Sequence, residues 1–140
     1  MGRRKPSFDQ QVYRMGVVWP HLALRRRVRQ VEAVWVGDFK PSPMSARYCV
    51  RVRHRPASYP EALVLAPKLE IREGADSLPH VFRDGSLCLH VQGDWQAWMF
   101  VADHFVPWIS GWLYFYEVWH ATGLWLGGGT HPNRPEHRCA

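Results

Sequence analysis

Cys88 is the residue of this chain best suited to covalent chemistry, and His80 and His90 lie close to it in the sequence. A thiolate is a far better nucleophile than a serine oxygen, and an acyl thioester stays reactive toward amines, so one cysteine can accept an acyl group and hand it on. A thiol with a pKa of about 8.5 is only a few per cent ionised at neutral pH, so either imidazole could assist by hydrogen bonding or as a base. Cysteine is also among the most buried residue types, so residue type alone leaves a structural role for Cys88 open.

The residues on both sides of Cys88 form a pattern. Residues 78–90 contain a proline, an apolar residue followed by an aromatic one, a turn with glycine and an apolar-Cys-Leu core. The positions that carry this pattern are Pro79, Val81, Phe82, Gly85, Leu87, Cys88 and Leu89. The pattern resembles the active-site segment of ubiquitin-conjugating enzymes, in which a His-Pro-Asn tripeptide precedes the same arrangement. Trp95 also lies close to where that family has a tryptophan after the cysteine.

A wider resemblance covers residues 30–132. The tryptophan-rich region and the tail over residues 125–132 make the chain similar to the bacterial ubiquitin-conjugating-like proteins of cyclic-oligonucleotide-based anti-phage signalling (CBASS) operons. The resemblance implies a single α+β domain over residues 1–140 with a UBC-like fold. That fold comprises an N-terminal helix, an antiparallel β-meander, an active-site cysteine loop and C-terminal helices.

The resemblance also implies a function. Cys88 would form a thioester with the C-terminus of a partner protein, a cGAS-like nucleotidyltransferase that makes cyclic nucleotides. It would then transfer that group to an acceptor, which the sequence does not identify, and so regulate anti-phage defence. No cofactor and no metal are expected. A noncatalytic binding module or scaffold for the same partner is the alternative.

The chain departs from the family pattern at the tripeptide. Leu78 replaces the family's histidine, and His80 stands in place of the asparagine thought to order the loop and stabilise the oxyanion. His80 could donate to a developing oxyanion or could simply pin the loop, and both interpretations stay open. The candidate catalytic residues are Cys88, His80, His90 and His131. His131 is included because the tail resembles the family's, and for His90 a solvated side chain is the alternative to a base.

Hydrophobic periodicity indicates the elements that must position these residues. Strands rich in β-branched and aromatic residues are expected after a helical N-terminal segment that is broken at Pro20. The predicted segments are residues 1–27 as the N-terminal helical segment, residues 31–36, 47–53 and 62–66 as strands of a meander, and residues 127–140 as an irregular tail. Residues 47–53 alternate cleanly, which predicts a half-buried antiparallel strand.

The aromatic region over residues 94–123 is predicted to be helical and largely buried. Its polar residues recur every seven positions and therefore form one narrow stripe: Gln96, Asp103, Ser110 and Glu117. Pro107 is expected to kink this helix or to begin a second one, and Gly123 to end it. Trp108, Trp112 and Trp119 share one face. That face either contacts the partner protein or belongs to the core, and both interpretations stay open.

The composition is typical of one folded cytoplasmic domain. The chain has 140 residues, 46% of them hydrophobic, which is enough to bury a single core. Three cysteines, an odd number, argue against a disulfide framework and indicate a reducing compartment. The formal charge of +6 suggests an acidic partner. A solvated sheet face explains the arginines equally well, so nucleic acid is not predicted as the main partner.

Other functions find less support in the sequence. A membrane span over residues 97–126 would be interrupted by charged residues and a proline, so membrane attachment is not predicted. The spacing of the cysteines and histidines matches no paired zinc motif. No glycine-rich nucleotide-binding loop follows a strand, so either the acyl group reaches the chain already activated or the partner is unusual.

Overall fold

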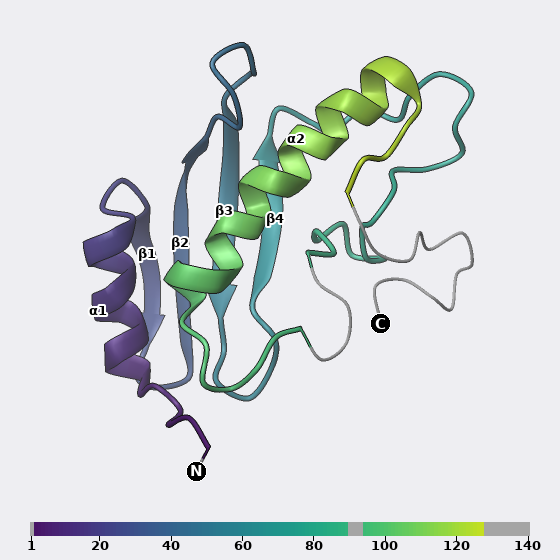
Figure 1. Cartoon of the computed structure of the whole chain (residues 1–140). Coiled ribbons are helices and arrows are strands. Elements are labelled where there is room, and N and C mark those ends of the chain that lie inside the picture. Colours follow the sequence, from purple (N-terminus) through teal and green to yellow (C-terminus); the bar gives the residue numbers. More distant parts are fainter. Residues whose placement is uncertain (1, 90–93, 128–140) are drawn as a thin grey trace.

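The computed structural model describes residues 2–89 and 94–127 and has the expected α+β, UBC-like architecture. In chain order the elements are α1 (Phe8–Val18), β1 (Ala23–Val28), β2 (Glu32–Phe39), β3 (Tyr48–His54), β4 (Glu61–Ala66), the π-helical turn η1 (Val101–Phe105) and α2 (Val106–Thr122). The strands form one four-stranded antiparallel sheet in the order β1-β2-β3-β4. α2 crosses one face of this sheet, and α1 lies at its β1 side (Figure 1).

β3 shows how the sequence pattern builds the core. Its residues alternate between buried and half-buried positions, as predicted, because successive side chains of a strand point to opposite faces. Val50 and Val52 are fully buried, and Val52 pairs with Trp35 of β2. The alternation continues to the end of the strand and carries His54 into the interior, where it is 6% exposed. One hydrophobic cluster joins this face of the sheet to α1, η1 and α2.

The N-terminal segment differs from the prediction in its second half. α1 begins with a capping box between Ser7 and Gln10 and ends before Pro20, but residues 23–28 form strand β1 rather than more helix. Every residue of β1 is exposed, so its sequence carries no burial pattern that marks a strand. Backbone pairing with β2 selects the extended conformation. The predicted three-stranded meander is therefore a four-stranded one.

Over the described residues 94–127, the C-terminal region forms one helix with a π-helical start, rather than several helices. Residues 94–100 are not helical, so the predicted helix begins too early and Gln96 lies outside it. Pro107 stands in the first turn of α2, and Gly123 ends it with a φ of 83°. Two other residues of the polar stripe make contacts within the fold: Asp103 pairs with Arg14 of α1 at 3.0 Å, and Glu117 accepts a hydrogen bond from the Tyr48 hydroxyl at 2.7 Å.

The tryptophan face of α2 belongs to the core. Trp112 and Trp119 are 3% and 7% exposed and lie in the central cluster, and Trp108 packs against that cluster. The interpretation of this face as a contact for the partner is therefore wrong. A helix that is apolar around most of its circumference has to be covered by its own domain, and the sheet and the segments beside it cover α2. Within the described residues, no helix has both the length and the apolar character needed to cross a membrane.

We predict that buried His54 makes the protein acid-sensitive. Burial, aided by the positive charge of Lys5, lowers the pKa of His54 from 6.5 to about 4. Between pH 6.5 and pH 4, His54 is protonated in the unfolded chain but stays neutral in the folded protein. The free energy of unfolding therefore falls as the pH falls through this range, by roughly 2 kcal/mol at pH 4.5. His54→Gln should remove this part of the loss in urea unfolding compared at pH 7 and pH 4.5. Exposed His21, changed to Gln, is the control, and an identical pH dependence in wild type and His54→Gln would contradict the assignment.

Candidate active site

Cys88 lies on one arm of a short β-hairpin, with His80 on the other. Val81 and Leu87 form a β-bridge, and the Phe82 amide donates to the Ser86 carbonyl at 2.8 Å. The Cys88 amide donates to the His80 carbonyl at 2.9 Å. The two leading candidates from the sequence are therefore brought together as cross-strand neighbours.

The tip of the hairpin is a tight turn that the sequence dictates. Gly85 has a φ of 91°, in the left-handed region where glycine carries no steric penalty. Asp84 accepts hydrogen bonds from the amide and the hydroxyl of Ser86, at 2.9 Å and 2.6 Å. These hydrogen bonds lower the pKa of Asp84. The glycine of the motif is thus required by the turn that returns the chain toward Cys88.

Two further hydrogen bonds fix the hairpin to the rest of the fold. The Leu87 amide donates to the Ala62 carbonyl of β4 at 2.8 Å, and Leu87 itself is buried in the core. The indole Nε1 of Trp112 donates to the His80 carbonyl at 3.0 Å. One arm is therefore held by the sheet and the other by α2.

His80 occupies a constrained position. Its φ of 51° places a non-glycine residue in the left-handed region, which costs on the order of 1 kcal/mol. The residue is 9% exposed, and its ring stacks on Trp125 with the centroids 4.8 Å apart. Trp125 in turn contacts the edge of Trp112. The imidazole is held between the hairpin and the segment that follows α2.

The sulfur of Cys88 is enclosed in this structure. Cys88 is 7% exposed and is disulfide-bonded, whereas Cys49 on β3 is a free, half-buried cysteine. Chemistry at Cys88 therefore requires reduction of the disulfide and an opening that exposes the sulfur.

Two of the candidate residues, His90 and His131, lie outside the described residues. The sequence had not indicated the two tryptophans that contact His80, because neither an indole-to-carbonyl hydrogen bond nor a ring stack leaves a periodic signal. Among residues 2–89 and 94–127, no group of three or more His, Cys, Asp or Glu side chains is placed to hold a metal ion.

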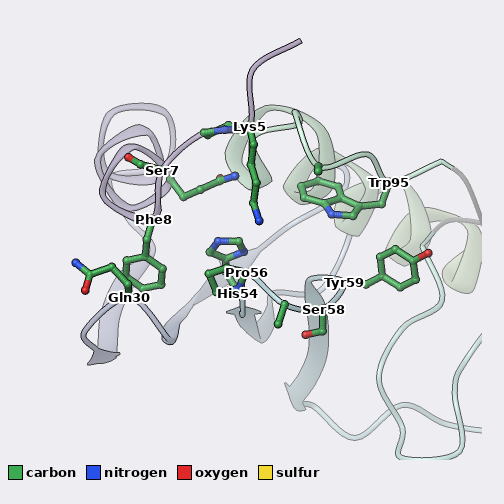
Figure 2. Close-up of a pocket in the computed structure, with 13 residues that line it drawn as sticks. Lys5, Ser7, Phe8, Gln30, His54, Pro56, Ser58, Tyr59 and Trp95 are labelled. Carbon is green, nitrogen blue, oxygen red and sulfur yellow. The ribbon is translucent and has the colours of Figure 1, made fainter. Parts of the chain in front are cut away.

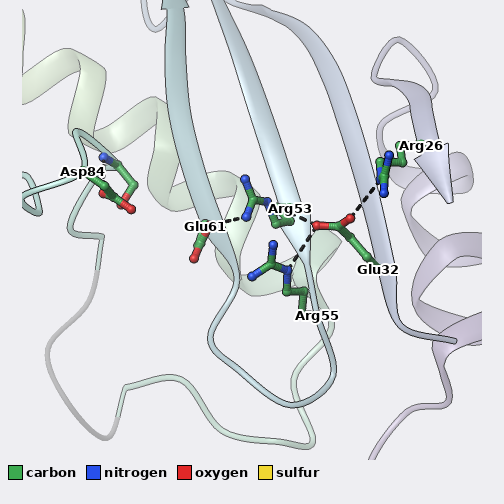
Figure 3. Close-up of polar contacts among 7 residues, drawn as sticks. Arg26, Glu32, Arg53, Arg55, Glu61 and Asp84 are labelled. Carbon is green, nitrogen blue, oxygen red and sulfur yellow. Dashed lines mark hydrogen bonds and ion pairs between the residues drawn. The ribbon is translucent and has the colours of Figure 1, made fainter. Parts of the chain in front are cut away.

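The outer face of the sheet beside the hairpin carries much of the positive charge. Glu32 contacts Arg26, Arg53 and Arg55 at 3.0 to 3.5 Å, and Arg53 also contacts Glu61 at 3.4 Å (Figure 3). These arginines are paired within the sheet, which supports their interpretation as a solvated sheet face. A hollow of about 440 Å³ on this face reaches Asp84 and Ser86 of the hairpin.

We predict that Trp112→Phe loosens the hairpin without unfolding the domain. The change keeps an aromatic ring in the core but removes the N–H that binds the His80 carbonyl, so the free energy of unfolding should fall by about 1 to 2 kcal/mol. Hydrogen exchange of the Cys88 amide should accelerate more than exchange of the β3 amides. Tyr114→Phe, on the exposed side of α2 at 45% exposure, is the matched control. Uniform acceleration across hairpin and sheet would show that Trp112 only fills the core.

Comparison with known families agrees with this geometry. A family model described as Type II CBASS E2 protein matches residues 11–132, a span that contains most of α1 and all of the sheet, the Cys88 hairpin and α2. No curated protein matches the chain. The matched span is most of the chain, and the structure has the fold that the active-site motif implied. The chain therefore belongs to the Type II CBASS E2 protein family.

Proposed function

We propose that Cys88 carries an acyl group as a thioester and passes it to an amine. The acyl donor is the C-terminus of a partner protein, for which a cGAS-like cyclic-nucleotide synthase of the same defence system is our candidate. Membership in the family gives the chain an E2-like role in CBASS. The observation that carries the proposal beyond this role is the pairing of Cys88 with His80 on a hairpin anchored to both the sheet and α2.

The reaction has two steps. The Cys88 thiolate attacks the carbonyl carbon of an activated C-terminus, such as an acyl adenylate or a thioester, so a C–S bond forms and the activating group leaves with its electron pair. An acceptor amine then attacks the same carbon, a C–N bond forms, and the thiolate leaves as the amine loses a proton. The chain itself must supply a reduced, accessible sulfur, and a reducing compartment such as the cytoplasm would keep it so.

His80 supports the reaction in this proposal. Its place across the hairpin from Cys88 and its stack on Trp125 hold the imidazole in one orientation. An imidazole N–H held near the thioester could donate to the oxyanion that develops in both steps, and a neutral ring could accept the proton of the amine. His90 and His131 remain proposed contributors to the same proton transfer.

A noncatalytic binding role is the second candidate, and one observation favours it. Cys88 is 7% exposed and disulfide-bonded, as in a cysteine that serves the fold. In that case the domain would bind its partner without forming a covalent bond. Thioester transfer predicts a covalent adduct with the partner that requires Cys88, whereas noncatalytic binding predicts no such adduct.

We predict a covalent adduct between reduced protein and its activated partner. The protein is first reduced, the reductant is removed, and the mixture is then separated on a nonreducing gel. The adduct should disappear on treatment with hydroxylamine, which cleaves thioesters and leaves disulfides. Cys88→Ala should form none, whereas Cys49→Ala should behave as wild type. An adduct of equal yield in Cys88→Ala would exclude the thioester, and partner binding without any adduct would favour the noncatalytic role.

We predict that His80→Ala slows transfer by roughly 10- to 1000-fold, the range for loss of one oxyanion donor or general base. His80→Asn is the informative companion, because asparagine tolerates the left-handed backbone and carries an N–H donor. If His80 acts as a donor, His80→Asn should retain most of the rate and show no imidazole-like pH dependence. If it acts as a base, both variants should be slow. A melting temperature that falls in step with the rate in both variants would instead make His80 structural.

A further inference from the structure

A second concave site lies away from the Cys88 hairpin. It is a groove of about 840 Å³ between the start of α1, the β1–β2 turn, the β3–β4 loop and the segment that leads to η1 (Figure 2). None of its lining residues belongs to the hairpin over residues 80–88. Pockets of about 300 to 1,000 Å³ are the usual size for small-molecule sites.

The walls of the groove are aromatic and apolar. Phe8, Tyr59 and Trp95 line it, together with prolines and alanines of the surrounding segments. Trp95 stands across the groove from Phe8, and the Lys5 side chain reaches down between them (Figure 2). Flat aromatic walls favour a ligand with a planar ring, because rings stack or meet edge to face at short distance.

Some polar groups of the groove already make hydrogen bonds within the fold. The Gln11 side-chain amide donates to the Met99 carbonyl and accepts from the Val101 amide, and the Ser7 hydroxyl caps α1. Lys5 makes no ion pair with any described residue, and the lining contains no Asp or Glu. The groove therefore presents one available cation and no carboxylate to oppose an anion.

His54 is the second available group. It stacks on Phe8 with the centroids 5.8 Å apart and is 6% exposed, and its Nδ1 has no hydrogen-bond partner among the described residues. A buried polar atom left without a partner costs about 1 to 3 kcal/mol. This atom has less than 1 Å² of accessible surface, so a molecule bound in the groove supplies the missing partner once the side chains beside His54 shift.

We propose that this groove binds a small ligand that combines a planar aromatic ring with an anionic group. The ring lies against Trp95 and Tyr59, the anion contacts the Lys5 ammonium, and a polar atom of the ligand meets His54. Two sources share this chemistry, a mononucleotide and an aromatic carboxylate. The inference does not depend on thioester chemistry at Cys88.

Nuclear magnetic resonance titration of the full chain tests the proposal. The probes are adenosine monophosphate, indole-3-acetate, adenosine and inorganic phosphate, each at low millimolar concentration. One or both aromatic anions should shift the resonances of Lys5, His54 and Trp95, and whichever binds more tightly identifies the source. Adenosine and phosphate alone should bind more weakly than adenosine monophosphate.

Variants of the exposed Lys5 separate a specific site from a general charge effect. Lys5→Ala should weaken binding of the aromatic anion about fivefold, and Lys5→Glu should weaken it further. Lys68→Glu, an exposed lysine outside the groove, should leave the affinity unchanged. The proposal is overturned if neither aromatic anion shifts these resonances, or if Lys5→Glu binds the aromatic anion as tightly as wild type does.

Discussion

The carbonyl oxygen of His80 holds the candidate site together. It accepts the Cys88 amide at 2.9 Å and the Trp112 indole at 3.0 Å, so it joins the two arms of the hairpin to each other and to α2. A buried carbonyl has two lone pairs, and here both are used. The backbone of His80 lies in the left-handed region, and the surrounding contacts sustain that strained conformation. Displacement of α2 would therefore displace His80 and Cys88 together.

The same dependence explains why α2 is so apolar. Its tryptophans fill the space over the sheet, and its Glu117 binds Tyr48 of β3, while Asp103 of the preceding turn η1 binds Arg14 of α1. Dense packing of α2 over the sheet fixes the position of the helix, and a fixed helix can hold the strained hairpin in place. α2, one face of which the sequence analysis considered as a contact for the partner, thus supports the site structurally. Buried Trp112 and Trp119 are not accessible to a protein partner.

The sequence predicted best where local rules and the fold agree. The turn at Gly85, the alternation of β3 and the helix stop at Gly123 each follow from one residue type or one period, and the structure has all three. β1 was missed because an exposed strand carries no hydrophobic pattern and depends on its neighbour for pairing. Trp125 and the burial of His54 could not be assigned because they depend on contacts between distant segments. For His54, the sequence held one signal of burial: the alternation of buried and half-buried positions in β3 continues to the end of the strand, where His54 stands.

Peptide mass spectrometry of a Cys88→Ser variant can locate the acyl bond, which we propose forms at residue 88. A serine at this position would replace the labile thioester with an oxygen ester that survives reduction and proteolysis but is cleaved by base. After incubation with the activated partner, the account predicts that the C-terminal remnant of the donor is found on residue 88. A remnant attached to a different residue would exclude an acyl bond at residue 88. So would the absence of a remnant from every peptide of the variant, if the wild-type protein still forms its adduct at another position.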